Sequence, residues 1–100
     1  MKLKELKAKY NLKEEHLTLL FDVLYTYHEF DMIYSFNELE VFFNATKYFD
    51  KPDRYYLKIF TDLIQMKLIE FINDKEAKFF IVAEEIRGIE FFNELEKEVC

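Results

Sequence analysis

This chain contains few of the residues that form loops and covalent cross-links. Its 100 residues include one glycine, one proline and one cysteine, and no tryptophan. So little glycine and proline favours long regular elements joined by tight turns, with helix dominating. The single cysteine, Cys100, excludes an internal disulfide and a cysteine-based metal site. Cys100 is either an inert tail residue or a bridge between two copies of the chain.

Long apolar segments are also lacking. The longest apolar runs have four or five residues, whereas a membrane-spanning helix needs roughly 20. The basic N-terminus, residues 1–5, is not followed by the apolar stretch of a secretory signal. We therefore expect no membrane segment and an intracellular, cytoplasmic location.

Residue types that carry catalysis or bind cofactors are scarce. Ser35 is the only serine and suits a helix cap, and the chain has no glycine-rich phosphate loop and no nucleophile motif. His16 and His28 are separated by twelve residues and have no cysteine partners, which does not suit a metal site. We expect neither an enzyme nor a cofactor or metal, and we interpret both histidines as ordinary packing or surface residues.

Apolar and aromatic residues are abundant, at 51% and 19% of the chain. A chain of this length can bury roughly two thirds of the surface that it exposes when unfolded, so one domain over residues 1–100 is expected. The aromatic content exceeds what one small core requires. The surplus indicates a surface that contacts a partner.

The net charge of −6 is unevenly distributed along the chain. Residues 1–9 carry four lysines against one glutamate, whereas residues 10–44 carry one lysine against seven acids. Residues 45–80 are nearly balanced, with seven basic and six acidic residues, and residues 81–100 carry two basic and six acidic residues. The acidic charge is therefore expected on the outer helices.

The spacing of apolar residues predicts two helices near the N-terminus. Leu3, Leu6 and Tyr10 define a short amphipathic helix within a basic extension, residues 1–11. Its lysines could reach DNA as an arm or simply form a solvated helix face. Asn11 fits an N-cap with Glu14 as its capping partner, which predicts a long second helix over residues 12–29.

The middle of the chain predicts a short strand and two further helices. Residues 32–34 are apolar and bounded by polar residues, as in a brief strand. Ser35 and Glu38 form a capping box that starts a short helix. Pro52, preceded by an acidic cap at Asp50, starts a helix over about residues 51–66. Within that helix, one face is apolar and the opposite face is polar.

The last third predicts a hairpin and a closing helix. Residues 68–72 and 78–82 read as strands joined by a polar turn. The helical period returns at Glu84 and continues to the end of the chain. The full order indicates an α+β, mainly helical fold: a winged helix-turn-helix with N-terminal and C-terminal helices and a two-strand wing.

Residues 35–96 resemble the winged helix-turn-helix transcriptional regulators of the MarR and PadR groups and small winged-helix proteins of archaea and their viruses. The resemblance rests on Glu38-Leu39, on Leu63 followed by Leu68-Ile69-Glu70, and on residues 80–85, Phe-Ile-Val-Ala-Glu-Glu. Lys67 departs from the family, because it stands where these proteins have a glycine in the left-handed conformation. For lysine this conformation costs on the order of 1 kcal/mol.

The resemblance implies DNA binding as a homodimer, with the 51–66 helix in the major groove and the 69–82 hairpin as the wing. The polar face of that helix carries two cations, a hydroxyl and an amide, with Tyr55 and Asp62 at its flanks. Lysines at the start of the helix and on the wing would hold phosphates. The expected DNA-binding residues are Lys47, Lys51, Arg54, Tyr55, Lys58, Thr61, Gln65, Lys75 and Lys78.

The first and last long helices provide the expected dimer contacts. Adjacent phenylalanines widen the apolar face of the last helix beyond one stripe, which favours a second copy. The expected interface residues are Leu17, Phe21, Ile89, Phe91, Phe92 and Leu95. The acidic balance supports an alternative, a winged-helix module that binds a protein and not DNA, for example a viral or plasmid-encoded inhibitor.

Overall fold

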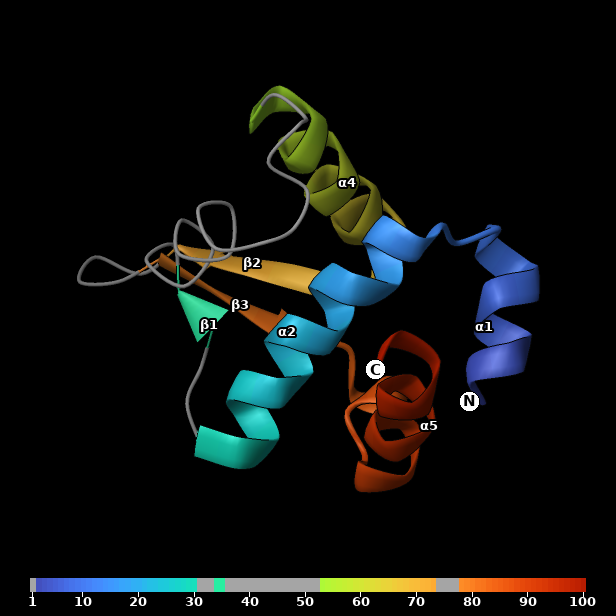
Figure 1. Cartoon of the computed structure of the whole chain (residues 1–100). Helices are drawn as coiled ribbons and strands as arrows, with labels where there is room; N and C mark the ends of the chain where they lie inside the picture. Colours follow the sequence, from blue (N-terminus) through green and yellow to red (C-terminus); the bar gives the residue numbers. More distant parts are fainter. Residues whose placement is uncertain (1, 31–33, 36–52, 74–77) are drawn as a thin grey trace.

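The computed structural model describes residues 2–30, 34–35, 53–73 and 78–100 (Figure 1). The helices are α1 (Leu3–Tyr10), α2 (Glu14–Phe30), α4 (Asp53–Gln65) and α5 (Ile89–Val99), with a 3₁₀ turn η1 (Glu84–Ile86) before α5. The strands are β1 (Tyr34–Ser35), β2 (Ile69–Asn73) and β3 (Lys78–Val82). The fold is α+β and mainly helical, as predicted.

The three strands form one antiparallel sheet in the order β1-β3-β2. Tyr34 lies opposite Phe80 in the β1–β3 pair, and Ile69 lies opposite Val82 in the β2–β3 pair. The order α2, β1, α4, β2, β3, α5 agrees with the predicted order of elements. The helix predicted to begin at Ser35 lies outside the described residues.

Helix α2 is the central element of the structure. It contacts α5, α4 and β1, while α4 also packs against β2 and α1 packs against α5 (Figure 1). Its buried leucines share one hydrophobic core with residues from each of the other helices that the structure describes. The side chains with almost no exposed surface are Leu6, Leu19, Leu20, Leu24, Leu63, Ile69, Ile86, Phe92 and Leu95.

The start of α2 differs from the sequence prediction. Asn11 ends α1 in the left-handed conformation, with φ of 52°, and is not the N-cap of α2. Lys13 occupies the N-cap position, because its carbonyl accepts a hydrogen bond from the amide of Leu17 (3.2 Å). The capping pair is therefore Lys13 with His16, because the ring of His16 accepts from the Lys13 amide (3.0 Å).

The C-terminal segment is also divided differently from the prediction, which had one helix beginning at Glu84. The chain turns at Arg87, whose guanidinium donates two hydrogen bonds to the carbonyl of Val82 (3.1 and 2.8 Å). The carbonyl of Arg87 in turn accepts from Nε2 of His28 (2.7 Å). These contacts hold a corner between η1 and α5, and α5 then begins after Gly88, whose backbone is extended.

Candidate nucleic-acid interface

Helix α4 has one buried side and one exposed side, as its sequence predicts. Ile59, Phe60 and Leu63 are buried, and the ring of Phe60 meets that of Phe80 edge-on at 4.3 Å between centroids. This contact fixes α4 on the sheet. The opposite side presents Arg54, Lys58, Thr61 and Gln65, and all four side chains are exposed. We call these four residues the polar face of α4.

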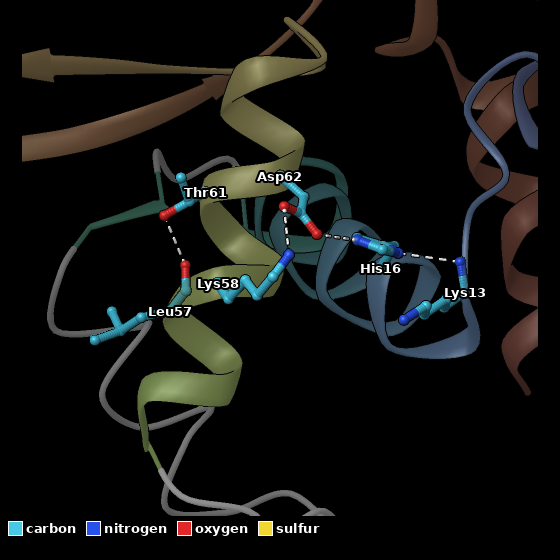
Figure 2. Close-up of polar contacts among 6 residues, drawn as sticks. All are labelled: Lys13, His16, Leu57, Lys58, Thr61 and Asp62. Carbon is cyan, nitrogen blue, oxygen red and sulfur yellow. Dashed lines mark hydrogen bonds and ion pairs between the residues drawn. The ribbon is translucent and has the colours of Figure 1, made fainter.

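The two residues predicted to flank the polar face, Tyr55 and Asp62, make different kinds of contact. Tyr55 is half-buried and packs against the core. Asp62 is also half-buried, and its carboxylate contacts side chains from two helices (Figure 2). Leu57 lies beside the polar face and is 50% exposed, so an apolar side chain accompanies the predicted polar ones.

The carboxylate of Asp62 divides its two oxygens between α2 and α4. Its Oδ1 accepts a hydrogen bond from the ammonium of Lys58 (3.3 Å), one turn earlier on the same helix. Its Oδ2 contacts Nε2 of His16 at 3.0 Å. Figure 2 shows the resulting chain of contacts, from Lys58 through Asp62 and His16 to the backbone of Lys13.

The hydrogen bonds of His16 define which nitrogen carries the proton. Because Nδ1 accepts from the amide of Lys13, it holds no proton in this arrangement. The proton is therefore on Nε2, which donates to Asp62. His16 is only 4% exposed, so its ring is a buried link between the start of α2 and the polar face.

The surroundings of Asp62 change its acidity in two opposing ways. Burial of the carboxyl raises its pKa, whereas the hydrogen bonds from His16 and Lys58, together with the positive charge of Lys58, lower it. The lowering prevails, so the pKa of Asp62 lies below its ordinary value. Asp62 is thus a stable negative charge beside the polar face at neutral pH.

The hydroxyl of Thr61 is turned toward its own helix. It donates to the carbonyl of Leu57 at 2.7 Å, the backbone bond that threonine commonly makes inside helices. The hydroxyl oxygen keeps lone pairs that can accept from an incoming donor.

The remaining predicted DNA contacts are only partly within the described residues. Lys47, Lys51 and Lys75 lie outside them. The backbone of Lys78 begins β3 opposite Asn73. Of the nine predicted residues, α4 therefore brings together Arg54, Tyr55, Lys58, Thr61 and Gln65.

Most of the predicted dimer residues belong to the core of the single chain. Leu17, Phe91, Phe92 and Leu95 are at most 5% exposed, and Phe21 is half-buried and stacks on Phe92 at 5.5 Å. The adjacent phenylalanines are consequently explained by packing within one chain, so the inference from surplus aromatics fails for them. Ile89, at 54% exposed, is the one predicted interface residue with a largely free side chain.

The basic extension packs against the acidic last helix. The amide of Leu3 donates to the carboxylate of Glu94 (3.1 Å), and Lys7 pairs with Glu98. Glu94 thereby satisfies a free N–H in the first turn of α1 and interacts favourably with the helix dipole. Because Leu3 and Leu6 are buried, α1 is part of the core.

Two features are absent from the residues that the structure describes. No helix among them is long and apolar enough to cross a membrane. Within the same residues, no three His, Cys, Asp or Glu side chains are grouped as metal ligands would be. Cys100 is exposed at the end of α5.

Sequence reasoning missed the role of His16. A signal was present in the spacing of Lys13 and His16, which matches that of an N-cap and its partner three residues later. Asn11 and Glu14 have the same spacing and more typical residue types, so they were favoured. Asp62 was recognised as a flank of the polar face, but its partner on α2 is 46 residues away in sequence.

Comparison with known proteins gives no match: no protein-family model, no curated protein and no solved structure is significantly similar to this chain.

Proposed function

We propose that this protein is a small DNA-binding regulator that inserts the polar face of α4 into the major groove. The observation that carries the proposal is the exposure of all four polar-face side chains on a helix whose opposite side is buried. The β2–β3 hairpin, which follows α4 directly, would contact the phosphate backbone as a wing.

The residue types of the polar face suit the edges of base pairs. Arg54 can donate two hydrogen bonds to guanine, and Gln65 can pair with adenine in the same way. Lys58, near the middle of α4, can reach a phosphate or a base. Such bidentate contacts are worth about 1 to 3 kcal/mol of discrimination each.

The acidic balance of the chain does not oppose this proposal as strongly as the net charge suggests. α5 carries four glutamates, two of which contact α1. α2 contacts both α4 and α5 and lies between them (Figure 1). The charge of these four glutamates is thereby separated from α4 by a helix and partly offset by the lysines of α1.

Fluorescence anisotropy with a labelled random-sequence duplex tests the proposal. We expect affinity to fall steeply with salt, and the double variant Arg54→Ala, Lys58→Ala to lose most of this affinity and about two units of the salt slope. A matched control is Lys4→Ala, Lys97→Ala, which removes the same charge from exposed lysines of α1 and α5. Full affinity in the Arg54, Lys58 variant, or equal losses in both variants, would refute the assigned face.

A protein partner is the second candidate, supported by the apolar surface. Leu57, Phe30 and Ile89 are 50%, 60% and 54% exposed, and such side chains favour protein contact over DNA contact. The two classes differ in salt dependence, because apolar contact persists at an ionic strength that dissociates a phosphate-bound protein. Absence of DNA binding at low salt would favour the second candidate.

We also propose a homodimer, with Ile89 as its accessible contact. Light scattering on the wild type and on Ile89→Glu tests this, because the substitution leaves the core untouched. A dimeric wild type that becomes monomeric on substitution supports the assignment. A monomeric wild type refutes it.

A further inference from the structure

Leu57 is an apolar side chain that lies beside the polar face of α4. It is 50% exposed, whereas Ile59 and Phe60 of the same helix are buried. By the helical period, Leu57 and Asp62 lie on opposite sides of the polar face. Figure 2 shows the side chain of Asp62 directed toward α2 and that of Leu57 directed away from α2. The polar face is therefore bordered by a carboxylate on one side and by an apolar side chain on the other.

The carboxylate side of α4 is the less favourable side for DNA. Asp62 contacts His16 of α2 at 3.0 Å, so this side faces the rest of the protein. Its negative charge also disfavours the approach of phosphates. We therefore expect a duplex to approach α4 over Arg54 and Leu57, which lie away from α2.

A second apolar group lies next to Leu57, one turn later on the helix. The hydroxyl of Thr61 donates its hydrogen to the carbonyl of Leu57 at 2.7 Å, so it has no hydrogen left to donate to a base. Thr61 is exposed, and residues four apart are neighbours on a helix surface. The methyl group of Thr61 and the side chain of Leu57 thus form an apolar strip alongside the donors of Arg54 and Gln65.

We propose that Leu57, together with the methyl group of Thr61, contacts the 5-methyl group of thymine in the major groove; this inference rests on the proposed function. Among the four DNA bases, thymine alone carries a methyl group there, and apolar side chains recognise it. Leu57 is therefore a specificity-determining residue that makes α4 prefer sites containing thymine.

The spacing of residues along α4 places this thymine near the guanine expected opposite Arg54. Arg54 and Leu57 are three residues apart, which corresponds to about 4.5 Å along a helix axis. Successive base pairs are about 3.4 Å apart. The thymine should therefore lie within about two base pairs of that guanine.

The experiment compares two duplexes that differ only in methyl groups. The first is a sequence selected from a random library for tight binding, and the second carries deoxyuridine in place of every thymine. The charge and the hydrogen-bonding groups of the bases are unchanged. Fluorescence anisotropy at fixed ionic strength measures both affinities. We expect the wild type to bind the deoxyuridine duplex about fourfold more weakly for each methyl group that it buries.

Three variants assign this difference to Leu57. Leu57→Ala should remove most of the difference between the duplexes, because alanine lacks the branched end of leucine. Leu57→Met keeps an apolar side chain of similar size and should keep the difference. The matched control is Phe30→Ala, because Phe30 is 60% exposed and lies at the end of α2 that is remote from the His16–Asp62 contact. This control should show the wild-type difference.

Equal affinity of the wild type for the two duplexes would overturn the thymine contact and leave the proposed function intact. A difference that persists unchanged in Leu57→Ala would also overturn it, because the methyl groups would then act through the shape of the duplex. A selected sequence without thymine has the same meaning. Failure of the wild type to bind any duplex at low salt would overturn the proposed function and, with it, this inference.

Discussion

The amide of Leu68 donates a hydrogen bond to the carbonyl of Leu63 across 3.0 Å, and this bond closes the end of α4. The amide of Lys67 donates to Ile64 at 3.0 Å, which completes a Schellman motif. Leu63 and Leu68 are both buried, as the apolar contact of this motif requires. Lys67, which directly precedes Leu68, is held at φ of 62°.

The first prediction is that Lys67→Gly stabilises the protein. Lysine is strained in the left-handed conformation because of its Cβ, whereas glycine is not. Glycine also has more freedom in the unfolded chain, which offsets part of the gain. We expect an increase of about 0.5 to 1 kcal/mol in the free energy of unfolding, measured by urea denaturation monitored by circular dichroism.

Lys67→Ala is the matched control for this prediction. It removes the same charge and the same long side chain but keeps a Cβ at positive φ, so we expect no comparable gain. Equal stabilisation by alanine and glycine would show that the charge of Lys67, and not its backbone conformation, is the cause.

The spacing of apolar residues and the positions of capping and turn residues predicted most helices and strands, because interactions between residues close in sequence form these elements. The left-handed conformation of Lys67 was expected from the family resemblance, and the buried side of α4 follows from the spacing of Ile59 and Phe60. The start of α2 was mispredicted because two residue pairs had capping spacing. The break before α5 was missed because it depends on His28 and Arg87, which meet only in the folded chain.

The polar face was predicted, but the link behind it was not. Arg54, Lys58, Thr61 and Gln65 share a side of α4 for geometric reasons that spacing reveals. No spacing rule connects His16 to Asp62, because they belong to different helices. In the same way, the sequence could not show that Phe91 and Phe92 would both fit into the core of one chain.

The second prediction concerns the attachment of α4 to the sheet. Phe60→Leu removes the edge-on contact with Phe80 and leaves a small cavity, so we expect a loss of about 1 to 2 kcal/mol. Leu57→Ala, one turn earlier on the same helix, changes a half-exposed side chain and should alter stability by less than about 0.5 kcal/mol. Chemical denaturation measures both, and equal losses would contradict the assigned buried side.

The third prediction concerns the docking of α1. Glu94→Ala removes the acceptor of the Leu3 amide and should loosen α1 by about 0.5 to 1 kcal/mol. Hydrogen exchange should accelerate in α1 more than in α2 or α4. Glu96→Ala is the control, because it removes the same charge from an exposed position of α5. Equal acceleration in both variants would mean that overall charge, and not the Leu3–Glu94 contact, holds α1.

The fourth prediction is the pH dependence of stability through Asp62. Its pKa is lower in the folded chain than in the unfolded chain, so the unfolded state binds the proton more readily. The resulting stabilisation is complete above the unfolded pKa, roughly pH 4, and is lost as the pH falls through the folded value. Asp62→Asn should therefore be less stable than the wild type at pH 7, by about 0.5 to 1.5 kcal/mol for a weakened hydrogen bond. The two proteins should approach the same stability near pH 2, and a difference that stays constant from pH 7 to pH 2 would show that the charge of Asp62 contributes nothing.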